Sequence, residues 1–160
     1  CEGPLAVRLA EYTDYSLRVL MYCARHADRR VTVAELAERQ GLPRNQVMKI
    51  VADFARHGLL QTARGRGGGV RLLRPADQIR VGDVVRLSET DFRMAECFDD
   101  AGGSCALAAG CRLRRLFAEA LRAYLGTLDG VTLAEIAGVG AVPRGRGVAT
   151  ARPRRLAAAA

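Results

Sequence analysis

The sequence predicts a mainly α-helical fold with a small β-hairpin wing: a winged helix-turn-helix followed by a long amphipathic helix. Three features of the chain lead to this prediction. Two helical segments are separated by a glycine turn, two short apolar runs flank a Gly-rich segment, and apolar residues recur at helical spacing from 113 to 128.

The first helix is predicted over residues 13 to 26, where apolar residues recur at intervals of three and four. A second, short helix is expected to end at Gly41, because glycine is common just past a helix end. The start of a helix is marked by a capping box, in which two side chains three residues apart bond each other's backbone amides. This spacing occurs twice, at Thr32 and Glu35 and at Thr132 and Glu135.

A third helix is predicted from Pro43 to about Arg56, since proline suits the first helical turn. A short helix, a glycine turn and a second helix form the helix-turn-helix arrangement, whose second helix reads the major groove of DNA. The outward side chains that can hydrogen-bond base edges or phosphates are Arg44, Asn45, Gln46 and Lys49. Taken alone, these residues fit the solvated face of a helical hairpin equally well.

A β-hairpin wing is predicted next, from strand-like runs at 59–63 and 70–73 that flank a segment with four glycines. Glycine lets such a tip approach a phosphate backbone closely. Arg64 and Arg66 in the tip can neutralise phosphates or enter a narrow minor groove. A nucleotide-binding loop is the alternative for a Gly-rich run, but the Gly-Lys-Ser/Thr ending of a P-loop is missing here.

The net charge of +8 is concentrated in the first half of the chain. Residues 1 to 81 contain 14 basic and 8 acidic side chains, whereas residues 82 to 142 contain 6 and 9. This distribution is typical of an N-terminal domain that binds nucleic acid. The low-complexity segment 138–160, rich in arginine and alanine, is predicted to be a disordered tail.

Three of the five cysteines, Cys97, Cys105 and Cys111, lie within fifteen residues. The chain shows neither a secretory signal nor a run of about 20 apolar residues, so we expect a cytoplasmic protein without a membrane span. Disulfides are disfavoured in that compartment, and clustered thiols there indicate a metal or iron-sulfur site, with unliganded thiols as the alternative. Such a site needs a fourth donor, from a carboxylate, a distant side chain, water or another subunit. Cys23 falls in a helical pattern and is expected to be a core residue.

The region 81–137 begins with a predicted helix at 81–88, and a longer helix starts near Cys111. The apolar stripe of the long helix must be covered, because an isolated helix is marginal in water. Antiparallel pairing with the same helix of a second subunit would give a homodimer with the symmetry of palindromic DNA. Packing on its own domain is the alternative. We therefore expect a DNA-binding domain at 7–80 and a cluster-binding and dimerisation region at 81–137.

Four segments together resemble the Rrf-type family of winged-helix regulators. They are the run from Val7 to Leu20, the wing from Leu59 to Gly69, Val-Gly-Asp-Val-Val at 81–85, and Cys-Phe-x6-Cys-x5-Cys-Arg-Leu from Cys97. The match extends over about residues 7 to 137. Within the family, the nitric-oxide-sensing repressors are the most similar.

The resemblance implies a homodimer with one cluster per subunit, a 4Fe-4S cluster with 2Fe-2S as the alternative, ligated by Cys97, Cys105 and Cys111. In the family the fourth ligand is an aspartate in the N-terminal helix of the partner subunit, and Asp14 occupies that position. From the residues alone, Asp14 is a carboxylate at a helix start. The family's iron-sulfur-assembly regulators place a histidine three residues after the third cysteine, where this chain has Arg114.

The function implied by the resemblance is repression. The dimer is expected to bind a palindromic operator in double-stranded DNA while its cluster is intact, and nitric oxide is expected to release it by nitrosylating the cluster. No enzymatic activity is expected. The alternatives are an iron- or redox-responsive regulator of the same fold and a zinc-stabilised DNA-binding protein. An electron-transfer protein is a third alternative, but it has no use for a recognition helix with a wing.

Overall fold

A computed structural model of the chain describes residues 9–89, 91–92 and 112–140. Within these ranges the elements follow in the order α1 (Glu11–Arg25), α2 (Val33–Gln40), α3 (Arg44–Arg56), β1 (Leu60–Ala63), β2 (Gly69–Leu72), the 3-10 helix η1 (Ala76–Gln78), α4 (Val81–Ser88), α5 (Arg112–Asp129) and α6 (Leu133–Ala137). The predicted fold class is confirmed, because helices predominate and β1 pairs with β2 as an antiparallel hairpin. None of the described helices is long and apolar enough to cross a membrane.

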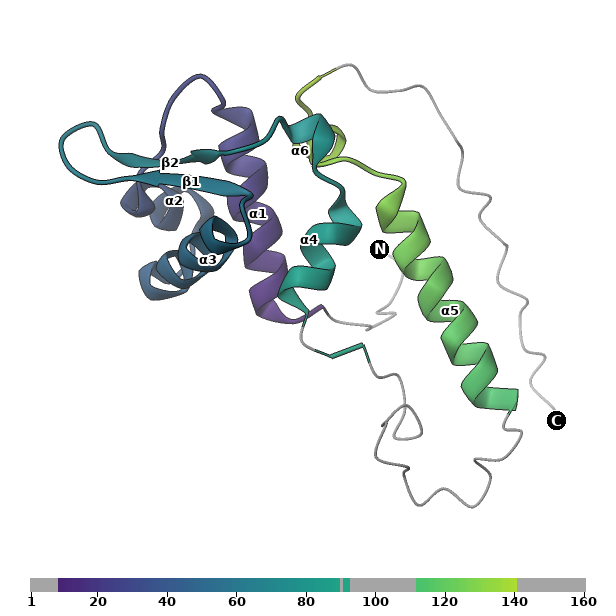
Figure 1. Ribbon diagram of the computed structural model, residues 1–160. Coiled ribbons are helices and arrows are strands. Elements are labelled where there is room, and N and C mark those ends of the chain that lie inside the picture. Colours follow the sequence, from purple (N-terminus) through teal and green to yellow (C-terminus); the bar gives the residue numbers. More distant parts are fainter. Residues whose placement is uncertain (1–8, 90, 93–111, 141–160) are drawn as a thin grey trace, which may run out of the picture.

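The helix α1 is at the centre of the fold (Figure 1). It packs against α2, α3 and the hairpin on one side and against α4 and α6 on the other. The long helix α5 contacts α4 and lies on the side of the molecule away from the hairpin. Fully buried side chains from all these layers except α5 form one core, with major contributions from Val19, Leu20, Leu36, Ile50, Phe54, Val70, Val84 and Leu133.

The ends of the helices follow the predicted signals closely. Thr132 and Glu135 form a complete capping box, in which Glu135 accepts from the Thr132 amide at 2.6 Å and Thr132 Oγ1 accepts from the Glu135 amide at 3.2 Å. At the start of α2, Thr32 Oγ1 accepts from the Glu35 amide at 3.1 Å. The carboxylate of Glu35 also accepts hydrogen bonds from Tyr22 and Arg29, which ties α2 to α1.

Two single-residue bridges join segments that are distant in the chain. Val31, just before α2, exchanges backbone hydrogen bonds of 2.9 and 2.8 Å with Val70 of β2. Arg80, just before α4, bridges Thr132 at the start of α6. The first bridge anchors the base of the hairpin beside the helix-turn-helix, and the second places the start of α6 beside the start of α4. Neither these bridges nor η1 has a signal in the local sequence.

Candidate nucleic-acid interface

The turn between α2 and α3 determines how the third helix leaves the core. Gly41 ends α2 with a φ of 62°, a left-handed conformation that favours glycine. The amide of Leu42 donates to the carbonyl of Ala37 at 2.9 Å, and the Leu42 side chain is buried. Pro43 follows at the N-cap position, so α3 begins at Arg44, one residue later than predicted. This short connection therefore holds α3 with its apolar side against the core.

The helix α3 has one buried and one exposed face. Its buried side chains are Val47, Ile50, Val51 and Phe54. The exposed face, opposite to the core, includes Arg44, Asn45, Met48 and Lys49. Cations, an amide and a thioether are the groups that contact phosphates, base edges and the thymine methyl group. The exposed face of α3 thus has the chemistry of a recognition helix.

The four residues predicted to contact DNA from α3 differ in their surroundings. Arg44, Asn45 and Lys49 are exposed, whereas Gln46 is half-buried. Oδ1 of Asn45 accepts a hydrogen bond from the Gln46 amide at 2.9 Å, so this side chain lies over the first turn of the helix. The Lys49 ammonium lies 5.1 Å from the centre of the Tyr12 ring, within cation–π range.

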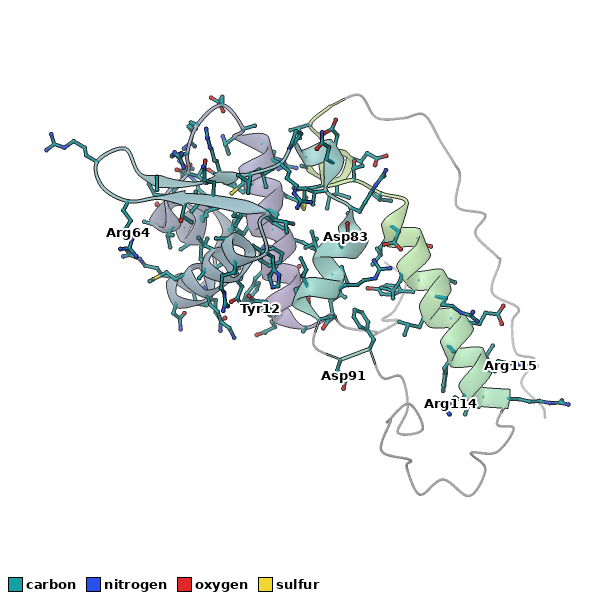
Figure 2. All side chains as sticks on the ribbon, in the orientation of Figure 1. Tyr12, Arg64, Asp83, Asp91, Arg114 and Arg115 are labelled. Carbon is teal, nitrogen blue, oxygen red and sulfur yellow. The ribbon has the colours of Figure 1, made fainter. Side chains whose placement is uncertain are left out.

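The hairpin carries the other two predicted DNA contacts, Arg64 and Arg66, which are both exposed at its tip. The strands pair from Leu60 opposite Leu72 to Ala63 opposite Gly69, which leaves residues 64 to 68 as the connection. Figure 2 shows Arg64 at the same end of the molecule as α2 and α3. The wing and the exposed face of α3 therefore offer cations at one end of the fold, away from α5.

Asp53, one turn after Lys49, is the one acidic residue of α3. It accepts hydrogen bonds from the Tyr12 hydroxyl and from the Arg56 guanidinium. The hydrogen bond from Tyr12 lowers the pKa of Asp53, and Arg56 and Lys49 lower it further. Burial and the hydrogen bond to Asp53 raise the pKa of Tyr12. At neutral pH the pair is therefore a neutral phenol that donates to a carboxylate, and it joins α1 to α3.

Asp14, the predicted cluster ligand, lies in the first turn of α1. Its side chain is 58% exposed and forms an ion pair with Arg18, one turn later, at 3.6 Å. Arg18 also donates a hydrogen bond to the carbonyl of Gln40, at the end of α2. A same-helix ion pair at the surface is weak, so the carboxylate of Asp14 is available to a partner from outside this fold.

The three clustered cysteines, Cys97, Cys105 and Cys111, lie outside the described residues. In the ranges that are described, no group of three or more His, Cys, Asp or Glu side chains is placed to hold a metal ion. Cys23 is 1% exposed, and burial raises the pKa of its thiol to about 12, which confirms it as a core residue. The candidate donors are thus three thiols and the exposed carboxylate of Asp14, a set whose chemistry fits an iron-sulfur cluster.

The long helix α5 has no buried side chain in the single chain. Its stripe includes exposed apolar residues, among them Leu113, Leu116 and Tyr124, and Leu116 is 59% exposed. Arg114 and Arg115 lie at the exposed start of α5, far from the wing (Figure 2). Apolar side chains at helical spacing that α4 leaves partly exposed indicate an interaction face.

Three residues of the interface were not predicted from the sequence. Met48 is exposed beside Lys49, and the helical spacing of α3 could have identified it. Tyr12 and Asp53 are 41 residues apart and bond across two helices. No local pattern connects such a pair, because the contact depends on how α1 packs on α3.

The chain matches the Rrf2 family, described as iron-dependent transcriptional regulators, over residues 9–138. It is 37% identical over 131 residues to the HTH-type transcriptional regulator NsrR of Bacillus licheniformis. The aligned residues make up 81% of this chain and 92% of that protein. NsrR of Bacillus subtilis is 39% identical over 131 residues, with 81% and 90% covered. Among solved structures, T. potens IscR shares the fold, with a TM-score of 0.69 and 24% sequence identity. The match covers 85% of this chain and 90% of the IscR chain.

Proposed function

The chain belongs to the Rrf2 family and is a transcriptional regulator, and on that basis we propose that it is an iron-sulfur repressor which nitric oxide releases from operator DNA. One structural relationship carries the proposal. The helix α3, whose exposed face is cationic, packs with its buried face against α1, and the first turn of α1 exposes Asp14. A ligand bond at Asp14 therefore acts on the helix that supports the DNA-reading surface.

In this proposal the operator is contacted from two elements. Arg44, Asn45 and Lys49 on α3 enter the major groove, and Gln46 contributes from its half-buried position. Arg64 and Arg66 bind phosphates or the adjacent minor groove. Phosphate contacts supply affinity and base contacts supply sequence preference.

The repressor is proposed to be a homodimer that forms through α5. The exposed stripe of α5 needs a cover, and the same stripe of a second copy supplies one with two-fold symmetry. Each subunit of the dimer then presents its α3 to one half of a palindromic site. The region 81–137 is accordingly assigned to cluster binding and dimerisation, and 7–80 to DNA binding.

The proposed cluster ligands are Cys97, Cys105, Cys111 and Asp14 of the partner subunit. When bound, a 4Fe-4S cluster supplies iron that reacts with nitric oxide, and 2Fe-2S is the alternative. As a ligand, Asp14 would hold the first turn of α1. In the structure its carboxylate pairs with Arg18, which also donates to the Gln40 carbonyl next to the turn before α3. The two arrangements must differ in operator affinity, since an effector that binds both equally shifts nothing.

The experiment that tests the proposal begins with anaerobic purification followed by iron and sulfide analysis. The protein is then titrated with nitric oxide while fluorescence anisotropy follows a duplex that the wild type selects from a randomised pool. We expect an iron-sulfide chromophore that nitric oxide bleaches as the duplex is released. Asp14→Ala is expected to weaken that coupling.

Other outcomes identify the competing functions. A colourless protein whose affinity for DNA does not change with nitric oxide would support the zinc-stabilised alternative. A chromophore with DNA binding that responds to oxidants or iron limitation, and not to nitric oxide, would identify the iron- or redox-responsive regulator. The absence of any iron-sulfide chromophore in oxygen-free preparations contradicts the proposal directly.

A further inference from the structure

Tyr12 joins the first turn of α1 to two successive turns of α3. Its hydroxyl donates a hydrogen bond to Oδ2 of Asp53. Its ring faces the ammonium of Lys49, with 5.1 Å between the nitrogen and the ring centre. Lys49 and Asp53 are four residues apart on α3 and therefore project from the same side of the helix. One side chain of α1 thus contacts both.

The contacts of Tyr12 occur where α1 and α3 are not packed solidly. A hollow of about 430 Å³ opens there, lined by residues of α1, α3 and α4 that include Tyr12, Tyr15, Gln46, Lys49, Asp53 and Leu87. Elsewhere the two helices meet through buried apolar side chains. Apolar packing is non-directional, whereas a hydrogen bond and a cation–π contact have preferred geometries. Tyr12 therefore supplies the directional contact at this end of the interface.

Asp53 is held in place for this contact from its other side. Its Oδ1 forms an ion pair with Arg56, while its Oδ2 accepts from Tyr12. Both carboxylate oxygens thus have a partner other than Lys49. The charge of Lys49 lowers the pKa of Asp53, but its ammonium lies over the Tyr12 ring, and no ion pair between Lys49 and Asp53 is formed among the described residues.

We propose that Tyr12 is a positioning residue for Lys49, and that it sets where the Lys49 ammonium reaches the operator. This inference rests on the proposed function, in which Lys49 contacts DNA. An exposed lysine has many rotamers, and ordering them opposes binding. A side chain held over an anchored ring has fewer conformations to lose. The hydroxyl of Tyr12 anchors the ring, and the ring orders the lysine.

A double-mutant cycle on DNA affinity tests the inference. The probe is a fluorescein-labelled duplex that the wild-type, anaerobically purified protein selects from a randomised pool. We expect Tyr12→Leu, which removes hydroxyl and ring, to raise the Kd for this duplex about five- to tenfold. Tyr12→Phe, which keeps the ring, should cause a smaller rise. In a Lys49→Ala background, Tyr12→Leu should change the Kd by less than about twofold, because the ordered group is gone.

Two controls separate positioning from a general effect on the fold. In an Arg64→Ala background, which changes the wing, Tyr12→Leu should raise the Kd by the same factor as in the wild type. The two residues do not touch, so their effects on binding should be independent. Tyr15→Phe removes a hydroxyl from the same helix that makes no hydrogen bond among the described residues, and it should leave the Kd unchanged. Urea unfolding of every variant shows whether Tyr12→Leu is folded. If it is not, the same cycle is run with Tyr12→Phe.

The inference is overturned if the Tyr12 substitution weakens binding by the same factor with and without Lys49, because its role is then structural. In that case the wild type still binds its duplex, and the proposed function stands. If the wild type selects no duplex and binds none in any cluster state, the proposed function fails and the positioning role fails with it.

Discussion

Arg86 and Asp129 join α4 to α5 by a two-pronged ion pair, with 2.5 Å from Nη1 to Oδ1 and 2.7 Å from Nη2 to Oδ2. The two residues are 43 positions apart. Two parallel hydrogen bonds fix the direction of approach as well as the distance. Because α5 has no buried side chain in the single chain, this ion pair is one of the contacts that hold the long helix against α4.

Asp129→Asn should loosen the junction between α4 and α5. Both partners are partly exposed and screened by water, so we expect a small decrease in the free energy of unfolding. The measurement is urea unfolding, run as a double-mutant cycle with Arg86→Gln. Asp28→Asn is the matched control, because the exposed Asp28 makes no ion pair among the described residues and its loss should cost nothing measurable. Strict additivity of the two substitutions would show that the pair contributes no coupling.

The effect of Gly82→Ala on stability should depend on the same ion pair. A Cβ at this buried glycine of α4 would lie 1.9 Å from Oδ1 of Asp129 and 2.9 Å from Nη1 of Arg86, so the pair must shift. Alanine is favoured over glycine by about 0.5–1 kcal/mol in a helix interior, and this is an upper limit for Gly82 in the first turn of α4. We expect Gly82→Ala to leave the free energy of unfolding of the wild type unchanged. Once Asp129→Ala has removed the carboxylate, Gly82→Ala should raise the free energy of unfolding. An equal effect in both backgrounds, measured by thermal unfolding, would contradict this account.

The helices and the hairpin could be predicted from the sequence because their signals are local. Residues 81–88 were predicted as a helix and α4 has those bounds, and the box at Thr132 caps α6 as expected. The exposed Arg64 and buried Cys23 follow from a glycine-rich tip and a helical stripe. Contacts that depend on packing had no such signal. The bonds of Tyr12 to α3 and of Arg86 to α5 join residues that no spacing rule relates.

Leu116→Arg should dissociate the proposed dimer. Leu116 is an exposed apolar residue of α5, and a charge placed in a paired stripe has no partner there. We expect the wild type to sediment as a dimer and the variant as a monomer with the same helix content by circular dichroism. Glu119→Arg, a change on the same helix but off the stripe, is the control and should stay dimeric. A dimeric Leu116→Arg variant would mean that α5 does not form the interface.

Stability should depend on pH through Glu35. The hydrogen bond from Arg29 is the main cause that lowers the pKa of Glu35 to about 2. A carboxyl group with a lowered pKa stabilises the fold above its ordinary pKa, and this contribution is lost as the pH falls through the folded value. Wild type should therefore exceed Glu35→Gln by about 1 kcal/mol in free energy of unfolding at pH 6. The difference should shrink steadily from pH 4.5 towards pH 2, whereas Glu38→Gln, on the exposed face of α2, should show no such trend.

The wing arginines should contribute affinity through phosphate charge. Arg64 and Arg66 are exposed at the hairpin tip, where each can neutralise one phosphate. Releasing one counterion per contact gives a slope of log K against log salt of about −0.9 per phosphate, so each Arg→Ala change should reduce the magnitude of the slope by about 1. Affinity should fall most at low salt and by a similar factor for selected and unrelated duplexes. Arg122→Ala on α5 removes the same charge far from the wing and should leave the slope unchanged. If Arg64→Ala and Arg66→Ala also leave it unchanged, the wing does not contact phosphate.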